Sequence, residues 1–259
     1  QTLRELVDAV AAAAVAAPPE GRPSRPPSLS SSPRPRGWAA ALVATLAYAF
    51  NWALMRVVFR LRVVGDENLP PPGTYIIVAN HVSYLDAPAL AAALPYRHMR
   101  RAFWGGDATL LFTIPLSGWL WRALNVVPVD ERLPGESLRG IGAMLEAGYD
   151  LMWFPEGWRS PTGELQHFQP GIGKIVAESG RIVVPALIAG TFEALPRGRV
   201  LPRPHRITVR VGNPFRIAQN PGGEAEFSRI AQILHDKVAA LLPGIDRDRF
   251  RCEDRFSVV

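Results

Sequence analysis

Residues 74–94 read TYIIVANHVSYLDAPALAAAL, and this stretch decides the fold. Its first part, TYIIVAN, is rich in β-branched and apolar residues and predicts a strand. Its last part, DAPALAAAL, predicts a helix that Asp86 opens and that carries Pro88 in its first turn. Only a short turn joins the two parts, so the stretch predicts a strand followed directly by a helix.

The same alternation of strands and helices continues along the chain from residue 61. Further strands are predicted for the segments LRVVG, RRAFW, NVVPV, DLMWF, RIVVPALI and HRITVRVG. Helices are predicted for three further segments, near 135–147, over 170–179 and over about 224–242. This order favours an α/β fold with a mixed, largely parallel sheet flanked by helices. We expect the domain to occupy residues 61–245, with a charged tail at 246–259.

The composition of the 259-residue chain excludes several classes of protein. Because 48% of the residues are apolar, a sizeable core can form, and wholesale disorder is excluded. The single cysteine, Cys252, excludes a disulfide framework and a cysteine-based zinc site. The histidines lack ligand spacing to one another, so no metal is predicted.

The formal net charge is +6, from 29 Lys+Arg and 23 Asp+Glu. This balance favours an anionic partner, such as a membrane surface, a phosphorylated substrate or nucleic acid. The arginine-rich stretches around 197–206 and 247–255 lack interleaved aromatic residues for base stacking. We therefore expect a lipid surface and no nucleic acid.

The first 37 residues differ in composition from the rest of the chain. Residues 1–17 predict a short helix, with Thr2 and Glu5 at the spacing of a capping box. Residues 18–37 are rich in proline, arginine and serine and predict an extended linker. Because TLRELVDAVAAA is similar to the last helix of an acyl-carrier domain, we expect an acyl-carrier or acyl-activating domain before residue 1.

Residues 38–60 predict a membrane-associated helix. Their apolar run, WAAALVATLAYAFNWALM, has a length near the lower limit for a membrane-spanning helix. Trp38 and Trp52 near its two ends suit an aromatic belt, whereas arginines on both sides leave the orientation open. A helix that lies in one leaflet fits as well as one that spans the membrane. A buried core helix is the alternative.

The turn NHVSYLD at 80–86 holds the first candidate catalytic pair. His81 follows the strand and Asp86 opens the helix, so the turn can bring the carboxylate to one imidazole nitrogen. The carboxylate would fix the tautomer and stabilise the imidazolium, and the other nitrogen would be free to act as a general base on an alcohol. The alternative is that Asp86 merely caps its helix and His81 is an incidental polar residue.

A second group of candidate residues, FPEGWRSPTGEL at 154–165, follows the apolar strand DLMW. It therefore lies at the carboxyl end of a strand, where open α/β sheets bind ligands. Pro155 and Gly157 predict a tight turn, and the planar guanidinium of Arg159 suits phosphate. We expect Glu156 to bind a hydroxyl, orient Arg159 or hold the loop, since its charge would repel phosphate. The alternative is a purely structural turn with a solvated arginine.

The combination of NHxSxxD with a later FPEGxRS resembles the glycerophospholipid acyltransferases, typified by lysophosphatidic acid acyltransferase. LNVVPVDER at 124–132 and the segment 168–198 resemble two further blocks of that family. The resemblance runs from about Leu61 to about Asn213. It implies the glycerol-phosphate acyltransferase fold and a reaction without a cofactor, in which acyl-CoA or acyl-carrier protein is the acyl donor.

The resemblance also implies roles for individual residues. His81 matches the catalytic base of the family, and Asp86 matches its partner carboxylate. Glu156 and Gly157 match the glycerophosphate-binding turn, and Arg159 matches the arginine that follows it. No metal ligand is implied.

The sequence departs from the family pattern at three places. The third block normally ends with an arginine directly after Val-Asp, but here Glu131 stands there and Arg132 follows as a candidate phosphate ligand. Trp158 stands where threonine is usual, and Gln169 stands where lysine is common. The last two departures bear on the head group of the acceptor and leave acyl transfer unaffected.

The reaction implied is a direct transfer. His81 removes a proton from the hydroxyl of a lysophospholipid, 1-acylglycerol-3-phosphate in particular, which attacks the thioester. Ser83 is expected to be a turn residue and not a nucleophile, since no acyl-enzyme is needed. We expect the protein at the cytoplasmic face of a bacterial inner membrane. A lipid or thioester hydrolase and a non-catalytic lipid-binding module are the alternatives.

Overall fold

The structure is a computed structural model that describes residues 37–107, 124–129, 134–219 and 222–242. The predicted segments at 1–17 and 246–259 lie outside these described residues. So do all but the last residue of the predicted linker at 18–37, and the candidate ligand Arg132.

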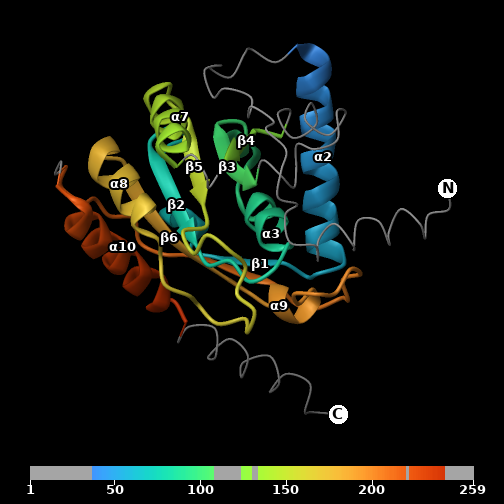
Figure 1. The fold of residues 1–259 in the computed structure, drawn as a ribbon. Helices are drawn as coiled ribbons and strands as arrows, with labels where there is room; N and C mark the ends of the chain where they lie inside the picture. The colour runs from blue at the N-terminus through green and yellow to red at the C-terminus, as the bar shows by residue number, and fades with distance from the viewer. Residues whose placement is uncertain (1–36, 108–123, 130–133, 220–221, 243–259) are drawn as a thin grey trace, which may run out of the picture.

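Within the described residues, seven strands form one sheet in the order β1-β7-β6-β2-β5-β3-β4 (Figure 1). The strands are β1 (Arg62–Val64), β2 (Tyr75–Ala79), β3 (Ala102–Asp107), β4 (Val126–Val129), β5 (Asp150–Trp153), β6 (Ile182–Ala189) and β7 (Thr208–Val211). All neighbouring pairs are parallel except β6 and β7, which are antiparallel. The predicted mixed, largely parallel sheet is confirmed, and every predicted strand segment overlaps one of these strands.

The helices of the described residues follow the predicted alternation with the strands. They are α2 (Trp38–Val57), α3 (Asp86–Ala93), α4 (Tyr96–Met99), α7 (Pro134–Glu146), α8 (Pro170–Ser179), α9 (Thr191–Ala194) and α10 (Glu224–Ala239), with a 3-10 helix η1 (Asp66–Asn68). The four helices predicted within the α/β domain correspond to α3, α7, α8 and α10. The short helices α4, α9 and η1 are additional to the predicted elements.

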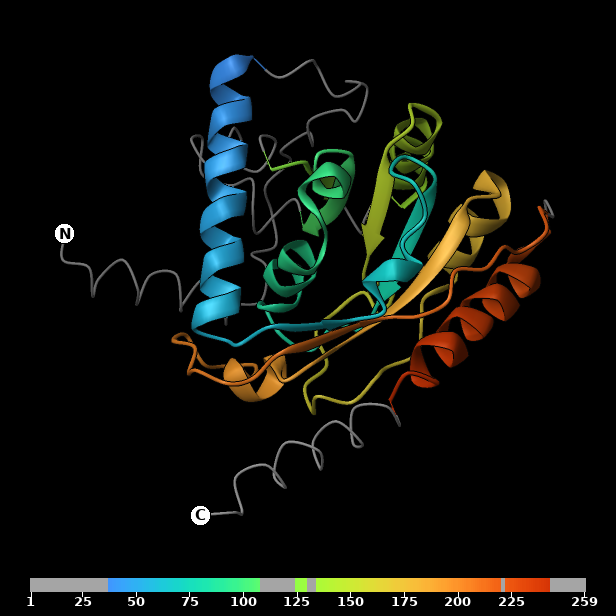
Figure 2. The same ribbon diagram turned by 180° about the vertical axis from the view of Figure 1, so that it is seen from behind.

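Two hydrophobic cores lie on opposite faces of the sheet because successive side chains of a strand point to opposite sides. On β2, Tyr75 and Ile77 belong to the core that α2 and α3 cover. Ile76 and Val78 belong to the core that α7, α8 and α10 cover. Figures 1 and 2 show the two helical layers on either side of the sheet. A fully buried β2 explains why its sequence is almost continuously apolar.

Helix α2 presents its polar side chains to the protein. Tyr48 Oη donates a hydrogen bond to the carbonyl of Leu94 (2.8 Å), and Asn51 Nδ2 donates to the carbonyl of Pro88 (2.9 Å). Met55, on the same side, is buried in the core. The polar residues that interrupt the apolar run therefore have partners on and after α3.

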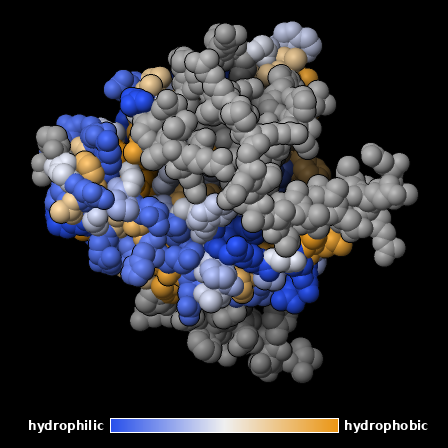
Figure 3. All heavy atoms as spheres, in the orientation of Figure 1, coloured by the Kyte–Doolittle hydropathy of each residue, from blue (hydrophilic) through white to orange (hydrophobic). Residues whose placement is uncertain are grey.

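The other side of α2 is exposed and apolar. Large apolar side chains recur there at every fourth residue, at Trp38, Leu42, Leu46 and Phe50. Apolar side chains are visible at both ends of α2 in the space-filling view, whereas the side of α8 and α10 is mostly hydrophilic (Figure 3). By length and composition α2 could cross a membrane, and only 11% of its apolar window is buried. The alternative of a buried core helix is therefore wrong.

Candidate active site

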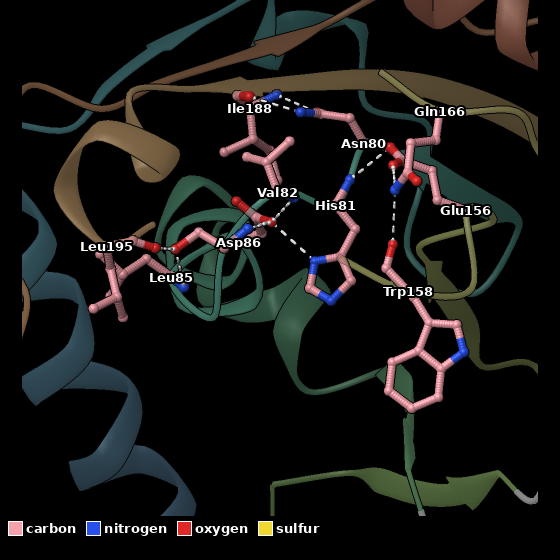
Figure 4. A network of polar contacts seen from close by, with 11 residues as sticks. Asn80, His81, Val82, Leu85, Asp86, Glu156, Trp158, Gln166, Ile188 and Leu195 are labelled. Atoms are coloured by element: carbon pink, nitrogen blue, oxygen red, sulfur yellow. Dashed lines mark hydrogen bonds and ion pairs between the residues drawn. The ribbon is translucent and has the colours of Figure 1, made fainter. Parts of the chain in front are cut away.

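The two candidate groups of the sequence meet at one edge of the sheet. Strands β2 and β5 are parallel neighbours, with Val78 opposite Trp153. Their carboxyl ends therefore lie side by side, and the segments that follow them, 80–86 and 154–160, leave the sheet together. Figure 4 shows the side chains of these segments around His81.

The imidazole of His81 is held on two sides. Its Nδ1 lies 2.9 Å from Asp86 Oδ2, and its ring stacks on Phe154 with 4.5 Å between ring centroids. The His81 side chain is 21% exposed, whereas the Asp86 side chain is fully buried. An ionised carboxylate can only accept, so Nδ1 carries the proton of this hydrogen bond. The arrangement leaves Nε2 as the nitrogen that can accept a proton from a substrate.

Asp86 is bound to the turn and does not cap its helix. Its Oδ2 also accepts the backbone N–H groups of Val82 (2.6 Å) and Ser83 (2.7 Å), which precede α3. The buried Ser83 hydroxyl donates to the carbonyl of Leu195 (2.8 Å) and accepts the N–H of Leu85 (3.2 Å). The helix-cap alternative for Asp86 is therefore wrong. Ser83 is the turn residue that the sequence predicts.

The segment after β5, which begins at residue 154, holds the backbone of His81 from both sides. Glu156 Oε1 accepts the N–H of His81 (2.8 Å), and the N–H of Ser160 donates to the carbonyl of His81 (2.8 Å). Glu156 Oε2 accepts from Gln166 Nε2 (3.0 Å), which also donates to the carbonyl of Trp158 (3.1 Å). Of the three roles expected for Glu156, these contacts correspond to holding the loop.

Burial dominates the electrostatics of Glu156. The residue is only 5% exposed, and burial raises the pKa of its carboxyl to about 7. The hydrogen bonds from His81 and Gln166 favour the ionised form and lower this pKa. A carboxyl group next to the backbone of the candidate base thus titrates near neutral pH.

The guanidinium of Arg159 lies over the ring of Tyr84, with Cζ 3.4 Å from the ring centroid. Burial lowers the pKa of Arg159, and repulsion by Arg197 lowers it further, whereas Tyr84 and Asp86 raise it. The sequence predicts that the guanidinium of Arg159 suits phosphate, and Tyr84, which it contacts, belongs to the turn of His81. The contact places a cation against the turn that carries the candidate base.

The turn at 155–157 depends on the backbone conformation of Gly157. Its φ is +82°, in the left-handed region, and a Cβ there would meet only Gln169 Cγ, at 3.7 Å. Glycine is therefore favoured by conformation and not by crowding. Trp158, which stands where the family usually has threonine, has a side chain that is 61% exposed. Gln169, which stands where lysine is common, is exposed beside the turn.

Three residues around the site were not assigned a role from the sequence. Asn80 exchanges two hydrogen bonds with the backbone of Ile188 (2.9 and 2.7 Å) and so fixes the turn to β6. Its position directly before His81 was the sequence feature from which a role in fixing the turn could have been predicted. Gln166 and Tyr84 carry no pattern of their own, because their contacts depend on how two distant loops meet. In the described part of the chain, no group of three His, Cys, Asp or Glu residues could hold a metal ion.

The geometry agrees with the comparison to known protein families. A family model with the description "Acyltransferase" matches residues 60–189, which is half of the chain and includes both groups of site residues. The chain belongs to this acyltransferase family. The resemblance to the glycerophospholipid acyltransferases that the sequence indicates is thereby confirmed.

Two 1-acyl-sn-glycerol-3-phosphate acyltransferases are similar to this chain over part of their length. A 1-acyl-sn-glycerol-3-phosphate acyltransferase of Chlamydomonas reinhardtii is 33% identical over 158 residues, which cover 59% of this chain and 46% of the relative. A chloroplastic one of Arabidopsis thaliana is 32% identical over 153 residues, or 57% of this chain and 41% of the relative. The chain thus spans less than half the length of these two relatives.

The fold of this chain is also similar to that of a solved structure. The crystal structure of the 1-acyl-sn-glycerophosphate acyltransferase from Thermotoga maritima superimposes with a TM-score of 0.63 at 26% sequence identity. The match covers 80% of this chain and 84% of that one. The expected glycerol-phosphate acyltransferase fold is confirmed.

Proposed function

We propose that the protein transfers a fatty acyl group from a thioester to the free hydroxyl of a lysophospholipid, 1-acylglycerol-3-phosphate in particular. The observation that carries the proposal is the contact between Oδ2 of the buried Asp86 and Nδ1 of the partly exposed His81 (2.9 Å) at the carboxyl end of β2. Membership of the acyltransferase family and the names of the similar acyltransferases support the same reaction.

The reaction needs one base and two substrates. Nε2 of His81 takes the proton of the acceptor hydroxyl while the hydroxyl oxygen forms a bond to the thioester carbon. Asp86 stabilises the imidazolium that results. The carbon–sulfur bond of the tetrahedral intermediate then breaks, and the leaving thiolate takes the proton from the imidazolium. These steps account for every bond and proton without an acyl-enzyme or a cofactor. Acyl-CoA or acyl-carrier protein supplies the acyl group.

Arg159 supports a phosphorylated acceptor. Its guanidinium lies over Tyr84, three residues after His81 in the same turn. A planar guanidinium can bind two phosphate oxygens at once. A phosphate bound there would hold the acceptor next to the base, which is why we favour a lysophospholipid with a terminal phosphate.

We further propose that α2 attaches the protein to a membrane, at the cytoplasmic face of a bacterial inner membrane. A soluble amphipathic helix buries its apolar side, but α2 directs Tyr48 and Asn51 to the protein and exposes Leu46 and Phe50. Lipid is the environment in which such an exposed side is stable. The net charge of +6 favours an anionic lipid surface.

A mass-spectrometric acyltransferase assay tests the reaction. It offers lysophospholipids in detergent micelles with acyl-CoA or acyl-carrier protein to the wild type, His81→Ala and His235→Ala. His235 is a matched control because it also contacts an aspartate, Asp236 at 3.2 Å, on the surface of α10. We expect diacyl product with the wild type and the control variant but not with His81→Ala.

Other outcomes of this assay would assign another function. Release of free fatty acid through His81, regardless of the acceptor, would show a hydrolase. Folded wild type without turnover on any donor would favour a non-catalytic lipid-binding module.

A further inference from the structure

We propose that Arg197 and Arg159 together bind the phosphate monoester of the acceptor, with Tyr84 holding Arg159 in position. The inference rests on the proposed function, since it assigns acceptor-binding residues within that site. Neither Arg197 nor Tyr84 has a role in the reaction as the sequence predicts it.

The segment that carries Arg197 is fixed to the turn of the candidate base. The buried Ser83 hydroxyl donates to the carbonyl of Leu195 across 2.8 Å, two residues before Arg197. The loop that follows is closed by Arg203, whose N–H donates to the carbonyl of Ala194 (2.9 Å). Arg203 Nε also donates to the carbonyl of Glu193 (2.7 Å). The backbone near Arg197 is therefore anchored on both sides and fixed to the turn that carries His81.

Arg159 and Arg197 are two cations on segments that both contact the turn of His81: Arg159 lies over Tyr84, and Arg197 follows Leu195, whose carbonyl accepts from Ser83. Repulsion by Arg197 contributes to the lowered pKa of Arg159, so the two groups interact electrostatically. Among the described residues, no carboxylate lies within ion-pair distance of either guanidinium. The aromatic face of Tyr84 supports Arg159 from one side and cannot neutralise its charge. Two guanidinium groups held in this way are stabilised when a doubly charged phosphate binds to both.

The position beside the base favours the phosphate of the acceptor over the phosphates of acyl-CoA. In 1-acylglycerol-3-phosphate, only four covalent bonds separate the oxygen of the reacting hydroxyl from phosphorus. Arg159 lies over Tyr84, three residues after His81 in the same turn, so a phosphate at Arg159 keeps this hydroxyl near His81. The phosphates of acyl-CoA are separated from its thioester by the long pantetheine arm.

Steady-state kinetics with a matched control tests the assignment. Arg197→Ala is compared with Arg199→Ala, because both arginines are exposed on the same loop and the change in charge is the same. We expect Arg197→Ala to raise KM for 1-acylglycerol-3-phosphate about tenfold, the usual effect of losing one charge-assisted hydrogen bond, with kcat nearly unchanged. KM for monoacylglycerol, which lacks the phosphate, and KM for acyl-CoA should not change. Arg199→Ala should alter none of these constants.

The role of Tyr84 is tested with two variants. Tyr84→Ala removes the ring under Arg159 and should raise KM for 1-acylglycerol-3-phosphate a few-fold. Tyr84→Phe keeps the ring and should restore most of the lost affinity. Equal effects of the two variants would overturn the positioning role of the ring.

A binding measurement separates this inference from the proposed function. Calorimetry with glycerol 3-phosphate, and with glycerol as the uncharged control, reports the phosphate site without turnover. Binding by the wild type that Arg197→Ala weakens about tenfold and Arg199→Ala leaves unchanged supports the inference even if no lysophospholipid is acylated, in which case only the proposed function fails. Equal binding by Arg197→Ala and Arg199→Ala overturns the inference even if acylation proceeds. Absence of binding by the wild type, or a rise of KM for acyl-CoA alone, overturns it as well.

Discussion

The backbone N–H of His81 donates to Glu156 Oε1 across 2.8 Å, although 75 residues separate the two in the chain. The contact joins the turn after β2 to the turn after β5. Because Glu156 is buried and its other oxygen accepts from Gln166, the carboxylate is already engaged by the protein. From these contacts we infer that Glu156 positions the candidate base.

Replacement of Glu156 separates positioning from substrate binding. We expect Glu156→Ala to lower kcat about 100-fold, since small displacements of a base cost that much, while KM for the acceptor changes little. Glu156→Gln keeps an acceptor for the His81 N–H and should lose about tenfold or less. Kinetics with 1-acylglycerol-3-phosphate measures both constants. Glu164→Ala is the control, because Glu164 is an exposed glutamate in the same segment after β5 as Glu156. A raised KM with an unchanged kcat would instead make Glu156 a substrate ligand.

The raised pKa of Glu156 predicts how stability depends on pH. The pKa is about 7 in the folded protein, against an ordinary value of 4.5. Between these values the folded state keeps a proton that the unfolded state releases, so the free energy of unfolding falls as the pH rises. The contribution is complete below pH 4.5 and is lost through about pH 7, with a size of about 1–3 kcal/mol.

Glu156→Gln tests this pH dependence because glutamine does not titrate. Urea unfolding at several pH values between 4.5 and 8 should give a flatter stability profile for the variant than for the wild type. Superimposable profiles would show that Glu156 ionises in the folded protein at its ordinary pKa.

The contact of Asp86 with His81 predicts a large effect on catalysis. Asp86→Asn removes the charge that stabilises the imidazolium and allows the wrong tautomer, so we expect kcat to fall about 1000-fold or more. Asp236→Asn removes the aspartate of the surface pair with His235 and should have little effect. Circular dichroism verifies that both variants fold. Activity of Asp86→Asn within tenfold of the wild type would contradict the assignment of the pair.

Sequence reasoning predicted the features of the site that are local in the chain. His81 and Asp86 belong to one turn of seven residues, so their pairing follows from the strand and helix on either side. The contacts of Glu156 and Arg159 depend on the adjacency of β2 and β5, which no local pattern encodes. Gln166 was missed for the same reason. In the fold, even the three-residue strand β1 was predicted from its β-branched residues, whereas α4 and α9, of four residues each, are too short to show the periodicity that a helix prediction needs.

The exposed side of α2 predicts membrane binding that depends on named side chains. Leu46 and Phe50 are 60% and 70% exposed, whereas Asn51 donates to the carbonyl of Pro88 on the opposite side. We expect Leu46→Glu combined with Phe50→Glu to abolish cosedimentation with vesicles of anionic phospholipid, because each charge opposes insertion by about 2–3 kcal/mol. The free energy of unfolding in detergent should change little, since neither side chain packs in the core.

Asn51→Leu is the matched change on the packed side of the same helix. It removes the hydrogen bond to Pro88 and leaves that carbonyl without this donor, so we expect a loss of about 1–3 kcal/mol in the free energy of unfolding. Vesicle binding should remain, because the exposed side is unchanged. The two variants thus separate packing from lipid contact. Undiminished cosedimentation of the double glutamate variant would show that lipid contacts another part of the protein.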